Sequence, residues 1–308
     1  MVDFAIDIGQ TQARIRVVQH GGPGRELETA GFVYGSDLLG SITRIVTECA
    51  GTLGLDRVDA VAVGSTGLHG RVPAVDEVLR QLNRTLTTTS IVLADDAVTA
   101  YLGARGDQDG VVVAAGTGMV GLGLGPAGAT RVDGVGYLIG DEGSGWWIGR
   151  RGIIAAISAA DGRPDGSAAL LARLQTRFGA VADFPGTLAA DPSPVAVVAS
   201  FAKDVADTAR DGDAVSAGIW REAGEHIGGV VAAAAAGAGL GDRPQWTLIG
   251  RLSRADDLLQ PGLDARLRPL APQASRVPPV GGPLDGVSRL LHVDVNRYGP
   301  LIRASRIG

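Results

Sequence analysis

The sequence predicts an α/β protein that is divided into two lobes. Strand-like and helix-like patterns alternate along the chain, which is typical of folds in which helices cover sheets. Two similar units, each a strand, a glycine turn and a second strand, begin near Phe4 and near Val111 and open the two halves of this alternation. A chain of 308 residues is also long enough for two cores. We therefore expect one lobe over residues 1–106, another over 107–308, and a cleft between them.

The first half contains a hairpin, two further strands and two helices. Ser36 and Asp37 precede apolar residues at helical spacing, and a high Val and Ala content marks the two buried strands. The polar run 106–110 interrupts these patterns, so we place the lobe boundary there. The expected elements are a hairpin over 4–18, a helix from 37 to about 51, strands over 59–64 and 90–94, and a helix over 97–104.

The second half repeats this order. A second hairpin is followed by a Gly-rich loop and by a helix that starts near Ser144. Ser253 and Asp256 have the spacing of a capping box, which predicts the start of another helix. The tail from residue 289 alternates apolar residues and could add a strand. The other expected elements are a hairpin over 111–124, a Pro- and Asp-rich excursion over 183–194, helices that end near 210 and span 214–236, and a strand over 246–249.

Composition excludes several classes of function. A net charge of −5 and an isoelectric point near 5.4 argue against a nucleic-acid partner, because phosphate neutralisation requires a basic stripe. Cys49 is the only cysteine, which excludes a disulfide framework, a thiolate zinc site and an iron–sulfur cluster. The first residues lack the pattern of a secretory signal, and the apolar stretch 227–240 is too short to span a bilayer. We therefore expect a cytoplasmic protein without a membrane partner.

The two glycine turns predict a clamp on a polyphosphate. Gly9 and Thr11 lie in the first turn, and Gly116, Thr117 and Gly118 form the second. At such turns, backbone N–H groups and a hydroxyl can converge on an anion without interference from side chains.

Two more common nucleotide motifs fit the sequence poorly. The run 116–121 matches the glycine pattern of dinucleotide-binding folds, but it continues as an alternating strand rather than as the helix that would hold the pyrophosphate. Lys203 is the only lysine and lies in no Gly-rich turn, which excludes a P-loop. Phosphate charge must then be met by backbone amides, Thr hydroxyls and Mg²⁺.

These motifs resemble those of one protein family. The segment 7–11 resembles the first phosphate motif of the actin-like sugar kinase superfamily, and 115–118 resembles the second. The segment 134–150, with Gly140–Asp141–Glu142–Gly143–Ser144 at its centre, is similar to the N-acetylglucosamine kinases, which are grouped with the BadF-type ATPases. The resemblance implies two ribonuclease-H-like lobes in an actin-like ATPase fold that close on ATP and a sugar.

The resemblance also implies a role for each carboxylate. Asp96, at the step from a strand to a helix, would be the general base, and the sequence leaves open that it caps the helix or that Asp95 does either job. Asp7 would hold Mg²⁺ beside the phosphates, unless turn amides satisfy its carboxylate. Asp141 would accept hydrogen bonds from sugar hydroxyls, or with Glu142 it would complement the dipole of the helix that follows.

The remaining expected contacts divide between nucleotide and sugar. The expected ATP-binding residues are Gly9, Gln10, Thr11, Gly116, Thr117, Gly118 and Gly250. The expected sugar-binding residues are Gly134, Val135, Gly136 and Asp141. Met119, Val120 and Val135 depart from the polar or aromatic residues that the family has on the sugar side, so the acceptor is less well defined than the nucleotide.

We therefore expect a kinase that transfers the γ-phosphoryl group of ATP to a hydroxyl, the 6-hydroxyl, of an amino sugar such as N-acetylglucosamine or glucosamine. The alternative is a divergent ATPase or ATP-sensing module of the BadF type without sugar kinase activity. Related kinases are often homodimers, so we also consider a homodimer.

Overall fold

The computed structural model describes residues 1–9, 12–19, 24–32 and 35–307. Contacts within the chain divide it into two compact units, which we call the first and the second unit. The first unit consists of Met1–Val112, Leu122–Arg131 and Pro278–Gly308, and the second of Val113–Gly121 and Val132–Val277. We describe each unit by itself, and the expected cleft stays a prediction.

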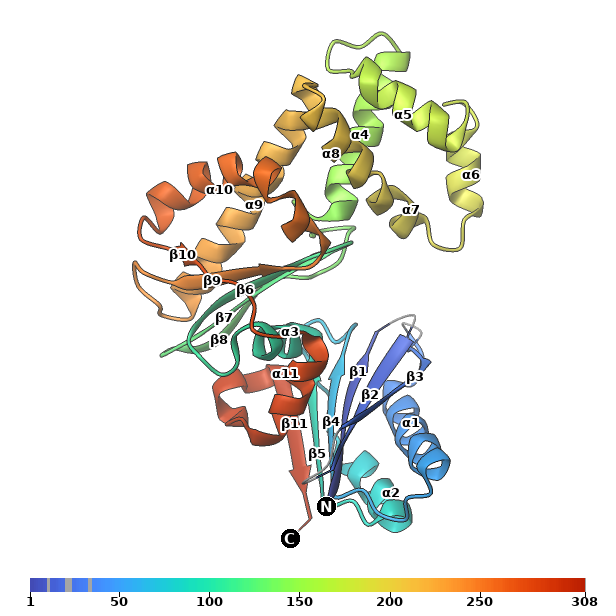
Figure 1. Ribbon diagram of the computed structural model, residues 1–308, viewed down its shortest axis with the longest axis vertical. Helices are drawn as coiled ribbons and strands as arrows, with labels where there is room; N and C mark the ends of the chain where they lie inside the picture. Colours follow the sequence, from blue (N-terminus) through green and yellow to red (C-terminus); the bar gives the residue numbers. More distant parts are fainter. Residues whose placement is uncertain (10–11, 20–23, 33–34, 308) are drawn as a thin grey trace. The chain divides into compact units, whose positions relative to one another are not determined.

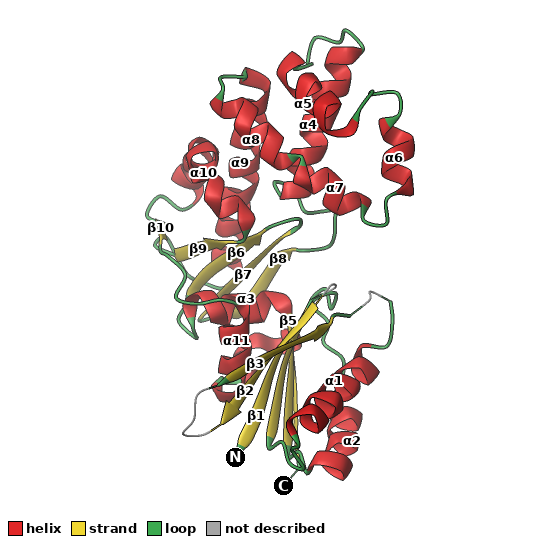
Figure 2. Ribbon diagram, turned by 45° about the vertical axis from the view of Figure 1, so that its right-hand side comes forward, coloured by secondary structure: helices red, strands yellow, loops and turns green. Residues whose placement is uncertain are grey.

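The first unit is built on a sheet with the strand order β11-β5-β4-β1-β2-β3 (Figures 1 and 2). Strand β1 pairs with β2 in the antiparallel direction and with β4 in the parallel direction, and β4 is parallel to β5. The strands are β1 (Val2–Ile8), β2 (Gln12–Gln19), β3 (Arg25–Ala30), β4 (Ala60–Ser65), β5 (Ser90–Asp95) and β11 (Ile302–Arg306).

Helices cover both faces of this sheet (Figure 1). On one side lie α1 (Leu38–Leu53) and α2 (Asp76–Leu86), and on the other lie α3 (Asp96–Arg105) and α11 (Pro283–Arg289). Side chains alternate between the faces of a strand, so Phe4, Ile6 and Ile8 of β1 share one face and join the core with the apolar residues of α1 and α2. Asp7 therefore points to the opposite face.

The face that carries α3 and α11 is packed through small residues. A Cβ atom on Gly286 would lie 1.8 Å from the carbonyl oxygen of Thr99, and one on Gly103 would lie 2.1 Å from that of Gly282. Glycine at these positions allows the two helices to approach at backbone contact distance. In this way α11, which is distant in sequence, fixes α3 over the sheet.

The C-terminal segment belongs to the first unit, which differs from the boundary expected at residue 106. Strand β11 pairs with β5 in the antiparallel direction, Ile302 opposite Ala94, and α11 packs on α3. The possible tail strand is therefore present. Its place in the first sheet follows from long-range pairing, which the local pattern of the tail does not contain.

The second sheet has the order β10-β9-β6-β7-β8, which repeats the order β5-β4-β1-β2-β3 of the first. As in the first sheet, a hairpin supplies the central strand, and later strands join it on its other side. The strands are β6 (Gly110–Ala115), β7 (Met119–Gly125), β8 (Gly128–Asp133), β9 (Gln245–Ile249) and β10 (Ser275–Arg276). The expected internal similarity of the two halves is thus present in the sheets.

Seven helices of the second unit follow the hairpin in the described part of the chain and lie on one side of the sheet (Figure 2). They are α4 (Gly145–Ala160), α5 (Ala168–Phe178), α6 (Phe184–Ala190), α7 (Pro194–Ser200), α8 (Ala202–Arg210), α9 (Ala214–Gly237) and α10 (Asp256–Leu270).

In this region, one expectation was incomplete and another was wrong. The excursion 183–194 contains the helix α6, which begins with Pro185 in its first turn, where proline is tolerated. Ser253 and Asp256 do not form a capping box. A 3₁₀ turn over Arg251–Ala255 precedes α10, Ala255 is the N-cap, and the Ser253 hydroxyl instead donates to the carbonyl of Gly250.

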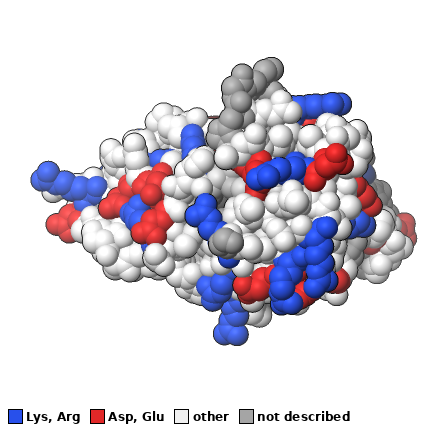
Figure 3. Space-filling view, turned by 90° about the horizontal axis from the view of Figure 1, so that it is seen from below, with Lys and Arg blue, Asp and Glu red and all other residues white. Residues whose placement is uncertain are grey.

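The surface carries charges of both signs. Figure 3 shows a face on which Lys and Arg side chains are interspersed with Asp and Glu. Among the described residues, no helix combines the length and the apolar character that are needed to cross a bilayer.

Candidate active site

The expected residues of the first unit gather at the carboxyl ends of three parallel strands. The register places Ile8 of β1 beside Ser65 of β4, and Ser65 beside Asp95 of β5. Loops that leave this edge of an α/β sheet are where such folds bind ligands. Asp7 and Asp96 therefore lie at the same edge, with the end of β4 between them.

Asp95 is a buried anchor rather than an exposed acid. Its side chain has no solvent exposure, and its two oxygens accept hydrogen bonds from the backbone N–H groups of Gly70 at 2.8 Å and Ala97 at 3.0 Å. The bond to Ala97 makes Asp95 the N-cap of α3. Nε of Arg131, on β8, lies 3.5 Å from Oδ1 of Asp95. Of the two jobs left open by the sequence, capping the helix thus belongs to Asp95.

Asp96 is the first residue of α3 and is only partly buried. Burial, followed by the negative charge of Asp95, raises the pKa of Asp96 to about 7. A hydrogen bond from the Thr66 side chain and the charge of Arg131 oppose this rise. The carboxyl group of Asp96 therefore changes its protonation state near neutral pH, which suits a general base.

Asp7 lies at the end of β1 and pairs with Arg14, whose guanidinium donates to it at 2.6 Å. The side chain of Asp7 is 17% exposed, so the carboxylate is not fully shielded from solvent. Mg²⁺ usually takes one or two protein carboxylates and completes its shell with water and phosphate oxygens. A single carboxylate here fits that mode. The described residues contain no group of three or more His, Cys, Asp and Glu side chains that could hold a metal ion by itself.

The first glycine turn is described only in part. The N–H of Gly9 donates to the carbonyl of Gln12, and the Gly9 carbonyl accepts from Phe32. Gln10 and Thr11, the other expected phosphate ligands of this turn, lie outside the described residues.

The second glycine turn, Gly116–Gly118, joins β6 to β7 and is held through its carbonyl groups. Gly116 N–H donates to Gly118 O within the turn, Gly145 N–H donates to Gly116 O, and Trp146 N–H donates to Thr117 O, all at 2.8–3.0 Å. All three carbonyl groups are thus used inside the second unit. The side chain of Thr117 is exposed, as a phosphate ligand would require.

Gly250 lies directly against the end of β6, where the second glycine turn begins. It has a φ of +92°, and a Cβ atom there would lie 2.3 Å from the carbonyl oxygen of Ala115. Both the left-handed backbone and the close approach to the end of β6 require glycine. The structure therefore brings Gly250 to Ala115, the residue before Gly116.

Asp141 is buried beneath the turn, with 8% of its surface exposed. Its Oδ1 accepts a hydrogen bond from the backbone N–H of Met119 at 3.0 Å. The Met119 side chain is buried as well, which explains why an apolar residue is accepted there. The other expected sugar-binding residues lie in the loop before Asp141. Gly134 and Gly136 have φ of +69° and +89°, and Val135 between them is 49% exposed.

Two residues at the site were missed by sequence reasoning. Thr66, which follows β4, contacts Asp96, and its position at the end of a parallel strand is a signal that could have identified it. Arg131 gave no such signal, because it lies within β8 and reaches Asp95 only through the tertiary fold.

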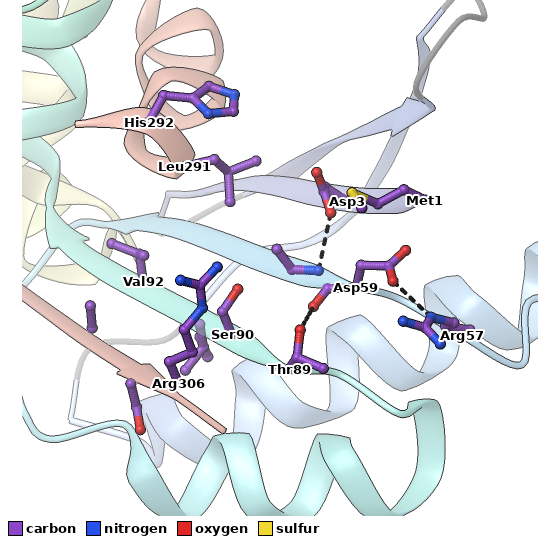
Figure 4. Close-up of a pocket in the computed structure, with 14 residues that line it drawn as sticks. Met1, Asp3, Arg57, Asp59, Thr89, Ser90, Val92, Leu291, His292 and Arg306 are labelled. Atoms are coloured by element: carbon purple, nitrogen blue, oxygen red, sulfur yellow. Dashed lines mark hydrogen bonds and ion pairs between the residues drawn. The ribbon is translucent and has the colours of Figure 1, made fainter. Parts of the chain in front are cut away.

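A pocket of about 580 Å³ lies at the other end of the first sheet, where β1, β4 and β5 begin (Figure 4). Asp3, Asp59, Ser90 and Arg306 line it. None of the expected site residues lies in this lining, so the candidate chemistry belongs to the opposite edge of the sheet.

The repeated sheet order and the carboxylates and glycine turns at the strand ends define a protein with the actin-like ATPase fold. The chain belongs to the BadF/BadG/BcrA/BcrD ATPase family, whose model matches residues 5–260.

Several individual proteins are similar to this one. An N-acetylmuramic acid/N-acetylglucosamine kinase of Clostridium acetobutylicum is 31% identical over 127 residues, which is 40% of this chain and 40% of that kinase. The match thus spans less than half of the length of that relative. The crystal structure of a protein from Chromobacterium violaceum, assigned as an N-acetylglucosamine kinase, is 27% identical, with a TM-score of 0.71 over 94% of this chain and 98% of that one. A glucokinase of the ROK family from Streptomyces griseus shares the fold, with 19% identity, a TM-score of 0.54 and coverage of 94% and 98%.

Proposed function

We propose that the protein is an ATP-dependent kinase that transfers the γ-phosphoryl group to the 6-hydroxyl of an amino sugar such as N-acetylglucosamine or glucosamine. The observation that carries this proposal is the environment of Asp96. A partly buried carboxyl group at the edge of the sheet has a pKa raised to about 7, next to a second carboxylate that is fully buried. A base that titrates near the operating pH can take up a proton and release it again.

In this proposal, Asp96 orients the acceptor hydroxyl and takes its proton as the new bond to the γ-phosphorus forms and the bond to the β-γ bridging oxygen breaks. ADP leaves with the electrons of the broken bond. Catalysis of this kind depends mainly on positioning and on stabilisation of charge. Asp95 would not act as the base in place of Asp96. Its carboxylate oxygens already accept hydrogen bonds from the N–H groups of Gly70 and Ala97 and pair with Arg131.

The phosphates would be held by backbone and hydroxyl groups. Gly9 of the first turn, Gly116, Thr117 and Gly118 of the second, and Gly250 beside them are the proposed nucleotide contacts, together with Gln10 and Thr11. Mg²⁺, when bound, would neutralise phosphate charge, and Asp7 is the residue that would hold it.

The acceptor is proposed from the relatives. The names of the Clostridium and Chromobacterium proteins point to N-acetylglucosamine, and the exposed apolar Val135 in the loop 134–136 suits the apolar face or the acyl group of such a sugar. The alternative, an ATPase or ATP-sensing module without sugar kinase activity, would share the nucleotide contacts and lack the acceptor.

The test is ADP release with Mg²⁺ and ATP, measured against N-acetylglucosamine, glucosamine, N-acetylmannosamine, N-acetylmuramic acid and glucose. We expect turnover that depends on one of the amino sugars, and we expect Asp96→Asn to lose that turnover while it still binds ATP. Nucleotide binding that no sugar converts into turnover would favour the ATPase or sensor instead.

A further inference from the structure

We infer that Asp141 is a positioning residue for the nucleotide, because it holds the turn Gly116–Gly118 in the shape in which its free N–H groups can receive a phosphate. The inference rests on the proposed function of that turn. It differs from the expectation that Asp141 serves the sugar hydroxyls.

The contact between Asp141 and the turn is direct. Oδ1 accepts the N–H of Met119, the residue that follows the turn, at 3.0 Å. The other oxygen lies against Gly118, where a Cβ atom would be 2.8 Å from Oδ2. The carboxylate thus occupies the space beside Gly118 that a side chain would need, and it fixes the exit of the turn.

The backbone around Asp141 is arranged for this contact at a cost. Asp141 has a φ of +60° and Asp133 one of +58°, both in the left-handed region that is uncommon for residues other than glycine. Oδ1 of Asp133 accepts the N–H of Asp141 at 3.0 Å, so one strained residue supports the other. A backbone conformation of this kind persists where the surrounding structure enforces it.

The same segment determines which backbone groups of the turn remain available to a ligand. Asp141 O accepts from Ser144 N–H, and the next two N–H groups, of Gly145 and Trp146, donate to the carbonyls of the turn. All the carbonyl groups of the turn then face protein donors. Within the described part of the chain, the N–H groups of Thr117 and Gly118 donate to no protein acceptor. Adjacent N–H groups that remain open in this way form an anion-binding concavity.

The Asp141 carboxylate has two properties that can be tested separately. It accepts a hydrogen bond, and it carries a negative charge. Only the acceptor is needed to hold Met119, and a negative charge close to a phosphate opposes binding. Asp141→Asn keeps the acceptor, and Asn tolerates the left-handed backbone. Asp141→Gly keeps the backbone and removes the acceptor, so the two variants form a matched pair.

The experiment measures the Kd of the full chain for Mg²⁺ with a non-hydrolysable ATP analogue, the KM of the acceptor, and hydrogen exchange of the amides of 116–119. We expect Asp141→Asn to bind the analogue within about threefold of the wild type. We expect Asp141→Gly to bind it at least tenfold more weakly, with the Met119 amide losing its protection. An unchanged Kd for the analogue in both variants, with the KM of the sugar raised, would overturn the inference in favour of a sugar contact.

A second comparison does not depend on nucleotide binding. Gly118→Ala is expected to expose the 116–119 amides to exchange, because the new methyl group meets Oδ2 of Asp141. Adding Asp141→Gly removes that clash, so the double variant should be no worse than Asp141→Gly alone. If the losses of amide protection in the two single variants simply added up in the double variant, the two residues would not act on each other. That result would contradict the inference. Failure of the wild type to bind the analogue, with this coupling intact, would instead reject the proposed function of the turn.

Discussion

Nε of Arg131 lies 3.5 Å from the carboxylate of Asp95, the residue before Asp96, and this pair places a positive charge inside the first unit. Asp95 has no exposed surface, and the side chain of Arg131 is 13% exposed. Burying a carboxylate costs several kcal/mol unless a partner and hydrogen bonds compensate for it. Here two backbone N–H groups and the Arg131 guanidinium compensate for the burial of Asp95. A buried carboxylate can therefore stand directly before the candidate base, Asp96.

Replacement of Arg131 is expected to affect both stability and the pH dependence of the reaction. In Arg131→Met, Asp95 loses its cation, and we expect a loss of roughly 3 kcal/mol in the free energy of unfolding, as for other broken buried pairs. The charge of Arg131 lowers the pKa of Asp96, so its removal shifts the rise of kcat with pH to higher pH. Urea unfolding and a pH profile of kcat measure the two effects.

Arg131→Lys is the matched control for this prediction, because it keeps the charge and changes the geometry. It should shift the pH profile less than Arg131→Met does. If both variants were destabilised and neither moved the profile, Arg131 would be structural only, and its proposed influence on Asp96 would be wrong.

Asp96→Asn is expected to abolish the reaction without harming the fold. General-base contributions are roughly 10²–10⁴-fold, so kcat should fall by about that factor. The pKa of Asp96 is raised in the folded state from 3.8 to about 7, so the folded protein binds this proton more tightly than the unfolded chain does. The stabilising contribution of Asp96 is therefore complete below pH about 4 and is lost as the pH rises to about 7.

The asparagine variant lacks this proton linkage. It should be more stable than the wild type at pH 8 and similar to it at pH 4, which urea unfolding at the two pH values can measure. A variant that is less stable than the wild type at pH 8 would mean that the ionised carboxylate is favourable in the fold, contrary to the raised pKa.

The close contact between α3 and α11 predicts a strongly unfavourable substitution. In Gly286→Ala, the new methyl group would lie 1.8 Å from the Thr99 carbonyl, and α11 would have to move away from the helix that carries Asp96. Overpacking of this kind costs typically 1–3 kcal/mol. Gly51→Ala in α1 is the control, since nothing lies within 4 Å of its Cβ position and alanine favours a helix by about 1 kcal/mol. If Gly286→Ala were as stable as Gly51→Ala in urea unfolding, the close helix contact would be contradicted.

The sequence contained enough to predict the repeated architecture. The two hairpins, the strands at 59–64 and 90–94 and the helix start at Ser144 follow from local periodicity and capping, and each is present. The place of the tail could not be predicted in the same way, because β11 is set by pairing with β5 across about two hundred residues. Strand β8, which carries Arg131, and helix α2 were not among the expected elements.

For the site, the sequence identified positions better than it identified partners. Asp95 and Asp96 are adjacent and chemically identical, and only the fold distinguishes the fully buried helix cap from the partly buried carboxyl group with the raised pKa. The pattern around Asp141 indicates a functional residue, but its hydrogen bond to Met119 joins segments that lie 22 residues apart. Contacts of that kind depend on backbone conformation, here a left-handed Asp, which residue identity does not reveal.

Removal of β11 provides a test of how the tail supports the first unit. Deletion of residues 302–308 exposes the edge of β5, the strand that ends at Asp95, and removes Ile302, which is 3% exposed. Loss of that side chain and of an edge ladder is expected to cost roughly 2–4 kcal/mol. Native-state hydrogen exchange should show faster exchange in β5, whereas β9 of the second unit serves as an internal control.

The substitution Ser305→Ala removes only the hydrogen bond to Asp76 and should change exchange in β5 little. Equal loss of protection in β5 and β9 would mean that the two units unfold as one, and unchanged protection in β5 would mean that the tail strand contributes nothing to the sheet that carries Asp95 and Asp96.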